Sequence, residues 1–121
     1  MQVIQKSSSG TQSLPLDAML LAQRTVFLTG EINTSTVNAI IQQLLFLESA
    51  DATAPIKLII TSPGGTVQAG LALYDQLKGM TVPIDLYCVE LAASMAAVIL
   101  AGGRRGHRFI LRLSMVMIHE R

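Results

Sequence analysis

The sequence predicts an α/β fold built from repeated strand–helix units around a mainly parallel sheet, and three observations support this. Apolar runs rich in β-branched residues recur along the chain, and the first two are followed by turn residues at Gly30 and at Ser62. Between these runs, apolar residues return every three or four positions, as on one face of a helix. The strand runs are apolar on both faces, which is typical of parallel strands joined by right-handed crossovers in a layered fold.

The length of 121 residues fits one domain, because domains commonly hold roughly 100 to 150 residues. The first residues are rich in Ser, Gln and Thr and lead to Pro15. We therefore predict a flexible N-terminal arm over residues 1–15 and one domain over residues 16–121.

The first strand–helix unit follows the arm. Residues 25–29 are mostly β-branched or aromatic and are followed by Gly30, which predicts a strand. Asn33 supplies a helix-capping side chain just before the next periodic segment. That helix is expected to bury a face formed by Val37, Ile40, Ile41, Leu44 and Leu45.

Two further units repeat this pattern, and two short strands follow them. Gly102 and Gly103 mark the end of the last predicted helix. The expected elements are, in order, a strand over 56–60, a helix over 67–80, a strand over 84–89, a helix over 92–101 and strands over about 108–111 and 115–118.

Composition excludes several classes of protein. A formal charge of +1 without a long basic run gives no surface for nucleic acid or an anionic membrane. The most apolar stretch, residues 91–100, is half of the roughly 20 residues that cross a bilayer. Cys88 is the only cysteine, which excludes an internal disulfide and a multi-cysteine zinc site and fits a reducing cytoplasm. The N-terminus lacks an apolar export signal. We expect a soluble cytoplasmic protein.

Reactive groups in an open parallel sheet collect at the carboxyl ends of strands, and two turns stand out there. In the first, residues 62–66, paired Gly64 and Gly65 allow close approach of a substrate and outward-pointing backbone N–H groups, as an oxyanion hole requires. The alternative is an ordinary tight turn between a strand and a helix.

The second turn holds Ser94 between small residues, in the run Ala-Ala-Ser-Met-Ala over 92–96. This pattern resembles a nucleophile elbow with alanine in the glycine positions. A helix beginning beside Ser94 would also aim its free N–H groups at a developing oxyanion. The alternative is that Ser94 only caps this helix.

A nucleophilic serine needs a base, and histidine is the usual one because neutral imidazole accepts the hydroxyl proton. His119 follows an apolar strand, so it is expected at the same sheet edge as the two turns. His107 follows a polar turn and is expected to face solvent. Cys88 lies among apolar residues and is expected to pack in the sheet.

At this point the residues resemble the proteolytic subunit of the Clp protease, a family of serine peptidases. The likeness runs from about residue 15 to the end and keeps the family's order. The shared segments are FLTGEI at 27–32, QLLFLE at 43–48, SPGG at 62–65, AGLALYD at 69–75, AASM at 92–95 and MIH at 117–119.

The resemblance implies a Clp- and crotonase-like layered fold and assigns roles by position. Ser94 is the expected nucleophile, His119 its general base, and the backbone N–H groups of Gly65 and Met95 the oxyanion hole. It further implies heptameric rings, normally two stacked, that enclose active sites and cleave unfolded polypeptide supplied by an AAA+ unfoldase. ATP is used by that unfoldase, and no cofactor or metal is expected in this chain.

The sequence also departs from the family pattern. In the family, a ring-joining helix and the catalytic aspartate follow the histidine, and this sequence stops at Arg121, so the head domain is expected to be incomplete. Ala96 stands where the family has Gly. Two alternatives to the peptidase stay open: an inactive structural subunit of a mixed Clp ring, and a crotonase-type acyl-coenzyme A enzyme, which also uses paired backbone N–H groups.

Overall fold

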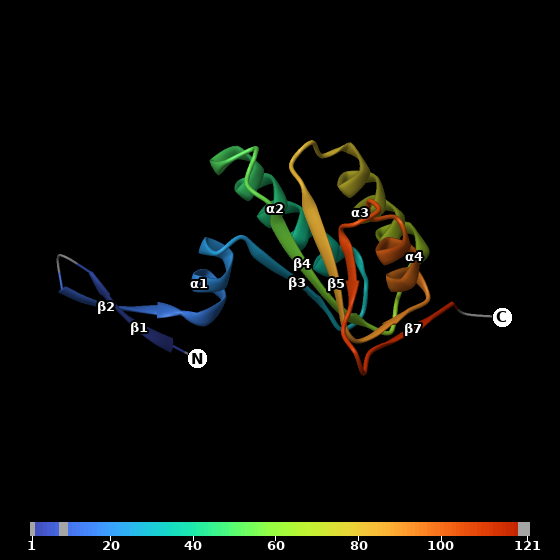
Figure 1. Cartoon of the computed structure of the whole chain (residues 1–121), viewed down its shortest axis with the longest axis horizontal. Coiled ribbons are helices and arrows are strands. Elements are labelled where there is room, and N and C mark those ends of the chain that lie inside the picture. The colour runs from blue at the N-terminus through green and yellow to red at the C-terminus, as the bar shows by residue number, and fades with distance from the viewer. Residues whose placement is uncertain (1, 8–9, 119–121) are drawn as a thin grey trace.

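A computed structural model describes residues 2–7 and 10–118, with side chains in helices and strands described from Leu16 onward, Asp17 excepted (Figure 1). At the N-terminus, β1 (Gln2–Ser7) and β2 (Gly10–Pro15) pair antiparallel. This hairpin projects away from the rest of the chain (Figure 1). Its two strands add to the elements predicted above, and the flexibility of residues 1–15 stays a prediction.

A five-stranded parallel sheet forms the centre of the fold, as predicted. Its strands are β3 (Thr25–Thr29), β4 (Ile56–Ser62), β5 (Ile84–Ala93), β6 (Arg108–Ile110) and β7 (Met115–Met117). The order is β3-β4-β5-β6, and β7 also pairs with β5. The long β5 pairs first with β6 and then, nearer its carboxyl end, with β7 along the same edge.

The described residues form four helices: α1 (Leu16–Ala22) precedes β3, α2 (Thr34–Ala50) follows β3, α3 (Val67–Gly79) follows β4 and α4 (Met95–Ala101) follows β5. The sequence analysis does not predict α1. At α2, Asn33 forms a reciprocal cap with Thr36: each side-chain oxygen accepts the other residue's backbone N–H at 2.9 Å. In residues 2–7 and 10–118, no helix has both the length and the apolar character to cross a bilayer.

The expected start of the last helix at Ala92 is wrong. Ala92 pairs with Ser62 of β4 and with Val116 of β7, and Ala93 pairs with Met117. Because strand neighbours on both sides bind this segment, it stays extended, and α4 begins only after Ser94.

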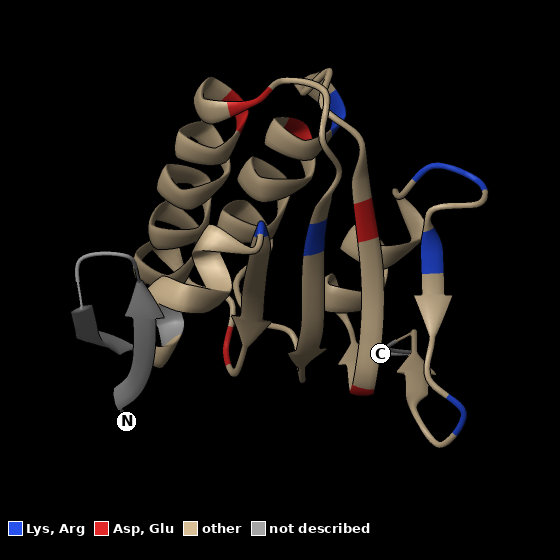
Figure 2. Cartoon of the chain, turned by 60° about the vertical axis from the view of Figure 1, so that its left-hand side comes forward, with Lys and Arg blue, Asp and Glu red and all other residues tan. Residues whose placement is uncertain are grey.

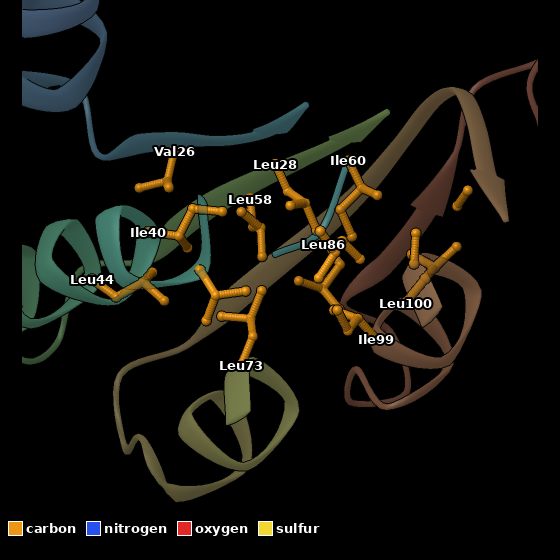
Figure 3. Packing of buried hydrophobic residues seen from close by; sticks show 14 of the residues in the cluster. Val26, Leu28, Ile40, Leu44, Leu58, Ile60, Leu73, Leu86, Ile99 and Leu100 are labelled. Atoms are coloured by element: carbon orange, nitrogen blue, oxygen red, sulfur yellow. The ribbon is translucent and has the colours of Figure 1, made fainter. Parts of the chain in front are cut away.

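The core lies between the sheet and helices α2, α3 and α4 (Figure 3). Alternate strand residues are fully buried and point toward the helices; among them are Val26, Leu28, Leu58, Ile60 and Leu86. From the helices, Ile40, Leu44, Leu73, Ile99 and Leu100 meet them. The expected burial of Leu45 is wrong, since 48% of its surface is exposed and Leu47 completes the buried stripe instead.

The opposite face of the sheet carries an apolar row across four strands. Register aligns Phe27 with Ile59, Ile59 with Tyr87, and Tyr87 with Phe109. The rings of Tyr87 and Phe109 stack with centroids 4.7 Å apart. Phe27 and Phe109 remain 42% and 40% exposed. Figure 2 shows charged positions on β4, β5 and β6, and the ammonium of Lys57 lies 5.7 Å from the centre of the Tyr87 ring. Within the described residues, the two ends of this row, Phe27 and Phe109, are therefore accessible to water.

Arg24 joins the start of β3 to the end of α2. Its guanidinium donates hydrogen bonds to the carbonyl oxygens of Leu47 at 2.9 Å and Asp51 at 2.8 Å. It also reaches the loop after the helix, at Ala54 O (2.8 Å) and Pro55 O (3.2 Å). A cation that binds the last carbonyls of a helix satisfies groups without helical partners and opposes the negative end of the helix dipole.

Replacing Arg24 with lysine tests this contact. One ammonium on a flexible stem cannot reach four carbonyls at once, so Arg24→Lys should lower the free energy of unfolding by about 1–3 kcal/mol. Urea denaturation measures the change. Arg105→Lys, on an exposed loop, is the control and should change stability by less than about 0.5 kcal/mol. Equal losses in the two variants would contradict the role of Arg24.

Candidate active site

Ser94 lies at the sharp turn between β5 and α4, with φ of 57° and ψ of −125°. An L-residue with a side chain seldom adopts a positive φ, and such a conformation costs on the order of 1–3 kcal/mol. The surrounding structure must hold it in place. A strained serine between a strand and a helix is the geometry of a nucleophile elbow.

Ser94 does not act as a helix cap. It occupies the position before α4, but its side chain makes no capping hydrogen bond. Its backbone N–H donates to the carbonyl of Met117 on β7 at 2.9 Å. In the part of the chain that the structure describes, the Ser94 hydroxyl is therefore left for other chemistry, and the capping alternative loses its support.

The glycine turn after β4 is held from both sides. The Ser62 hydroxyl is buried and accepts the N–H of Gly64 at 3.0 Å. Ile32, which follows β3, donates its N–H to Gly64 O and accepts the N–H of Thr66, both at 2.9 Å. These bonds fix a turn whose backbone would otherwise be free to move.

The two turns are in direct contact at Gly64. A Cβ on Gly64 would lie 2.7 Å from the Cβ of Ser94 and 2.8 Å from the carbonyl oxygen of Ala93. It would also lie 3.3 Å from the backbone nitrogen of Met95, and Gly64 has a φ of +103°. Only glycine fits here. The structure thus brings together the two turns that the sequence singled out separately.

Gly65 and Met95 each keep a backbone N–H that binds no acceptor within the described residues. Met95 is the first residue of α4, where helix geometry provides no partner. Gly65 is flanked by bonds that use Gly64 O and Thr66 N instead of its own N–H. Two free donors beside a serine have the character of an oxyanion hole.

An irregularity in β5 places Ser94 at this point. From Cys88 to Ala92 the strand advances four residues, while its neighbour β4 advances two, from Ile60 to Ser62. Glu90 lies inside this bulge with a φ of 72°. Bulges commonly re-aim side chains beside active sites. Glu90 cannot be picked out from the sequence, because neither its residue type nor its spacing signals a bulge.

The expected base, His119, lies outside the described residues. The strand that leads to it, β7, is described and pairs Met117 with Ala93, next to Ser94. His107 is at the other end of β5, where its Nδ1 lies 2.5 Å from Asp85 Oδ1 and its side chain is 44% exposed. It is therefore remote from the two turns and partly faces solvent, as expected.

Cys88 is fully buried in the sheet. Burial raises the pKa of its thiol, because the apolar surroundings disfavour the thiolate. A buried protonated thiol is a poor nucleophile. Its position confirms the expected packing role.

Substituting Gly64 tests the contact between the two turns. Gly64→Ala should lower the free energy of unfolding by more than about 2 kcal/mol, since the added Cβ meets backbone atoms and φ is positive. Urea denaturation measures the loss. The control is Gly79→Ala at the end of α3, where an added Cβ meets nothing within 4 Å. If both variants unfold at the same urea concentration, the close approach described above is wrong.

Comparison with protein families adds independent information. The model of the Clp protease family matches residues 8–121, which is nearly the whole chain. The match covers the glycine turn, the Ser94 elbow and the strands that position them. The chain therefore belongs to the Clp protease family.

Proposed function

We propose that this chain is a serine endopeptidase subunit of a self-compartmentalising, ATP-dependent Clp protease that cleaves unfolded polypeptides in the cytoplasm. The observation that carries the proposal is the strained Ser94, whose hydroxyl binds no described residue and which packs against Gly64. Family membership supplies the reaction class, peptide-bond hydrolysis.

In the proposed first step, the imidazole of His119 takes the proton of Ser94 Oγ as that oxygen bonds to the substrate carbonyl carbon. The N–H groups of Gly65 and Met95 stabilise the resulting oxyanion. The carbon–nitrogen bond then breaks, and the imidazolium gives its proton to the leaving amine. Water, activated by the same imidazole, hydrolyses the acyl-serine and restores the Ser94 hydroxyl.

The register of β7 supports the role of His119. Met117 O accepts the N–H of Ser94 at 2.9 Å, and His119 follows Met117 by two positions. Covalent geometry alone keeps the Cα atoms of Met117 and His119 within about 7 Å of each other. The short separation from Met117 in the sequence therefore supports His119 as the base for Ser94.

We assign no orienting carboxylate among the aspartates of this sequence. Asp85 is paired with His107 at the opposite end of β5. Asp51 accepts hydrogen bonds from Thr53, which lower the pKa of its carboxyl group, and it lies at the end of α2. By the resemblance to the Clp peptidases, we propose that the orienting aspartate belongs to a segment that follows His119.

A fluorophosphonate probe tests the nucleophile. We expect one probe per chain, attached to Ser94 when mapped by tandem mass spectrometry, because an activated serine displaces fluoride while ordinary hydroxyls do not. Ser94→Ala should abolish labelling. Ser49→Ala, on the exposed end of α2, should leave it unchanged. No labelling of an assembled sample would overturn the proposal and favour an inactive structural subunit.

We also propose that the chain assembles into heptameric rings, two of them stacked, that receive substrate from an AAA+ unfoldase. Family membership motivates this, and the open apolar surfaces support it. Besides the row on the sheet, Leu45 and Phe46 on α2 are 48% and 59% exposed. Because the sheet row and α2 are different surfaces, contact between them would join subunits head to tail, as in a ring.

Native mass spectrometry tests assembly. We expect the parent protein to give a multiple of seven subunits, and Phe46→Asp to shift the population toward monomers, because a charge would be buried in the contact. Ala52→Asp adds the same charge in the exposed loop after α2, away from the face that carries Phe46, and is the control. A parent protein that stays monomeric at every concentration would contradict the ring.

A further inference from the structure

We propose that Ser114 is a positioning residue for the nucleophile: by binding Glu90, its hydroxyl fixes β7 on β5 and so holds Ser94 in its strained conformation. This inference rests on the proposed function of Ser94. The hydrogen bonds of Ser114 within the described residues go to Glu90 and Leu111, so its effect on Ser94 passes through β7.

A hydrogen bond at the bulge joins Glu90 to Ser114. The backbone N–H of Glu90 donates to Ser114 Oγ at 2.7 Å. In a parallel sheet, a bulged residue loses its regular ladder partner. Glu90 is such a residue, since β6 pairs with β5 only as far as Cys88 and the pairing of β7 with β5 begins at Leu91. The Ser114 hydroxyl therefore replaces the missing strand partner.

Glu90 also contacts a third strand, β4. The Thr61 hydroxyl lies 3.3 Å from Glu90 Oε1, so Glu90 contacts β4 through its side chain and the start of β7 through its backbone. Ser114 is fixed in turn by its own N–H, which donates to Leu111 O at 2.9 Å. The bulge thus connects β4, β5 and the loop before β7.

Burial contributes little to holding β7 in place. Met115, Val116 and Met117 remain 55%, 39% and 47% exposed, so hydrophobic burial supplies only a fraction of what a core strand gains. The position of β7 depends mainly on hydrogen bonds. Ser114 directly precedes this strand and supplies a bond of short length at its start.

A backbone hydrogen bond links β7 to the nucleophile. Met117 O accepts the N–H of Ser94 at 2.9 Å, and Ala93 pairs with Met117. A residue at φ of 57° keeps that conformation only if its neighbours hold it. If the start of β7 loosens, the carbonyl of Met117 moves and the restraint on Ser94 weakens. The Ser94 hydroxyl then spends less time in the reactive geometry.

The experiment measures the rate at which a fluorophosphonate labels Ser94 in folded protein. Ser114→Ala should slow labelling about tenfold to hundredfold, the range expected for small misplacement of a reacting group. Ser114→Thr keeps a hydroxyl and should restore most of the rate. Ser49→Ala removes a hydroxyl far from the site and is the control.

Amide hydrogen exchange gives a second readout that does not depend on reactivity. Ser114→Ala should speed exchange of the Ser94 N–H while leaving the core of β4 unchanged, because only the bond to Met117 O is loosened. Unchanged labelling and unchanged exchange in Ser114→Ala would overturn the inference. Failure of the parent protein to label would overturn the proposed function instead, and the exchange measurement would still decide the role of Ser114.

Discussion

The contact between Gly64 and Ser94 is the constraint on which the candidate site depends. It requires a glycine, because a Cβ would overlap Ser94 and the carbonyl of Ala93. It also requires that β4 and β5 end at the same level, although β5 has two more residues between the paired positions. The bulge at Glu90 absorbs that difference. Two free N–H groups and a strained serine meet only because these conditions hold together.

The sheet supports two separate tasks. Its carboxyl edge gathers the turns that carry Ser94 and Gly64, as parallel sheets generally do. Its open face carries the aligned side chains of Phe27, Tyr87 and Phe109, of which Phe27 and Phe109 remain 42% and 40% exposed. Since the edge and the face do not overlap, chemistry and association can proceed on the same domain without competing for surface.

Local sequence patterns predict the parts of this structure that depend on local physics. The strands at 25–29 and 56–60, the capped helix after Asn33 and the glycine turn all follow from periodicity and residue type. The start of α4 does not, because pairing with two neighbouring strands keeps Ala92 and Ala93 extended. The sequence does not decide whether Leu45 or Leu47 faces the core beside Leu44, because all three are apolar. The packing of α2 against the sheet buries Leu47 and leaves Leu45 exposed.

Local sequence patterns likewise predict only part of the candidate site. Ser94 and Gly64 can be picked out from the small residues around them, but their contact depends on the relative register of two strands, which no local pattern encodes. Glu90 and Ser114 are 24 positions apart and carry no motif. Their hydrogen bond arises only when the bulge leaves an N–H without a strand partner, so tertiary structure is needed to find it.

The backbone conformation of Ser94 has a consequence for how the sequence can evolve. Glycine would adopt a φ of 57° without strain, so the serine makes the fold less stable than it needs to be. Selection for stability alone would replace it, and only selection for a hydroxyl at this position retains it. A lineage of this chain that no longer needed the hydroxyl would therefore be expected to drift toward glycine at position 94 and to gain thermal tolerance as it did.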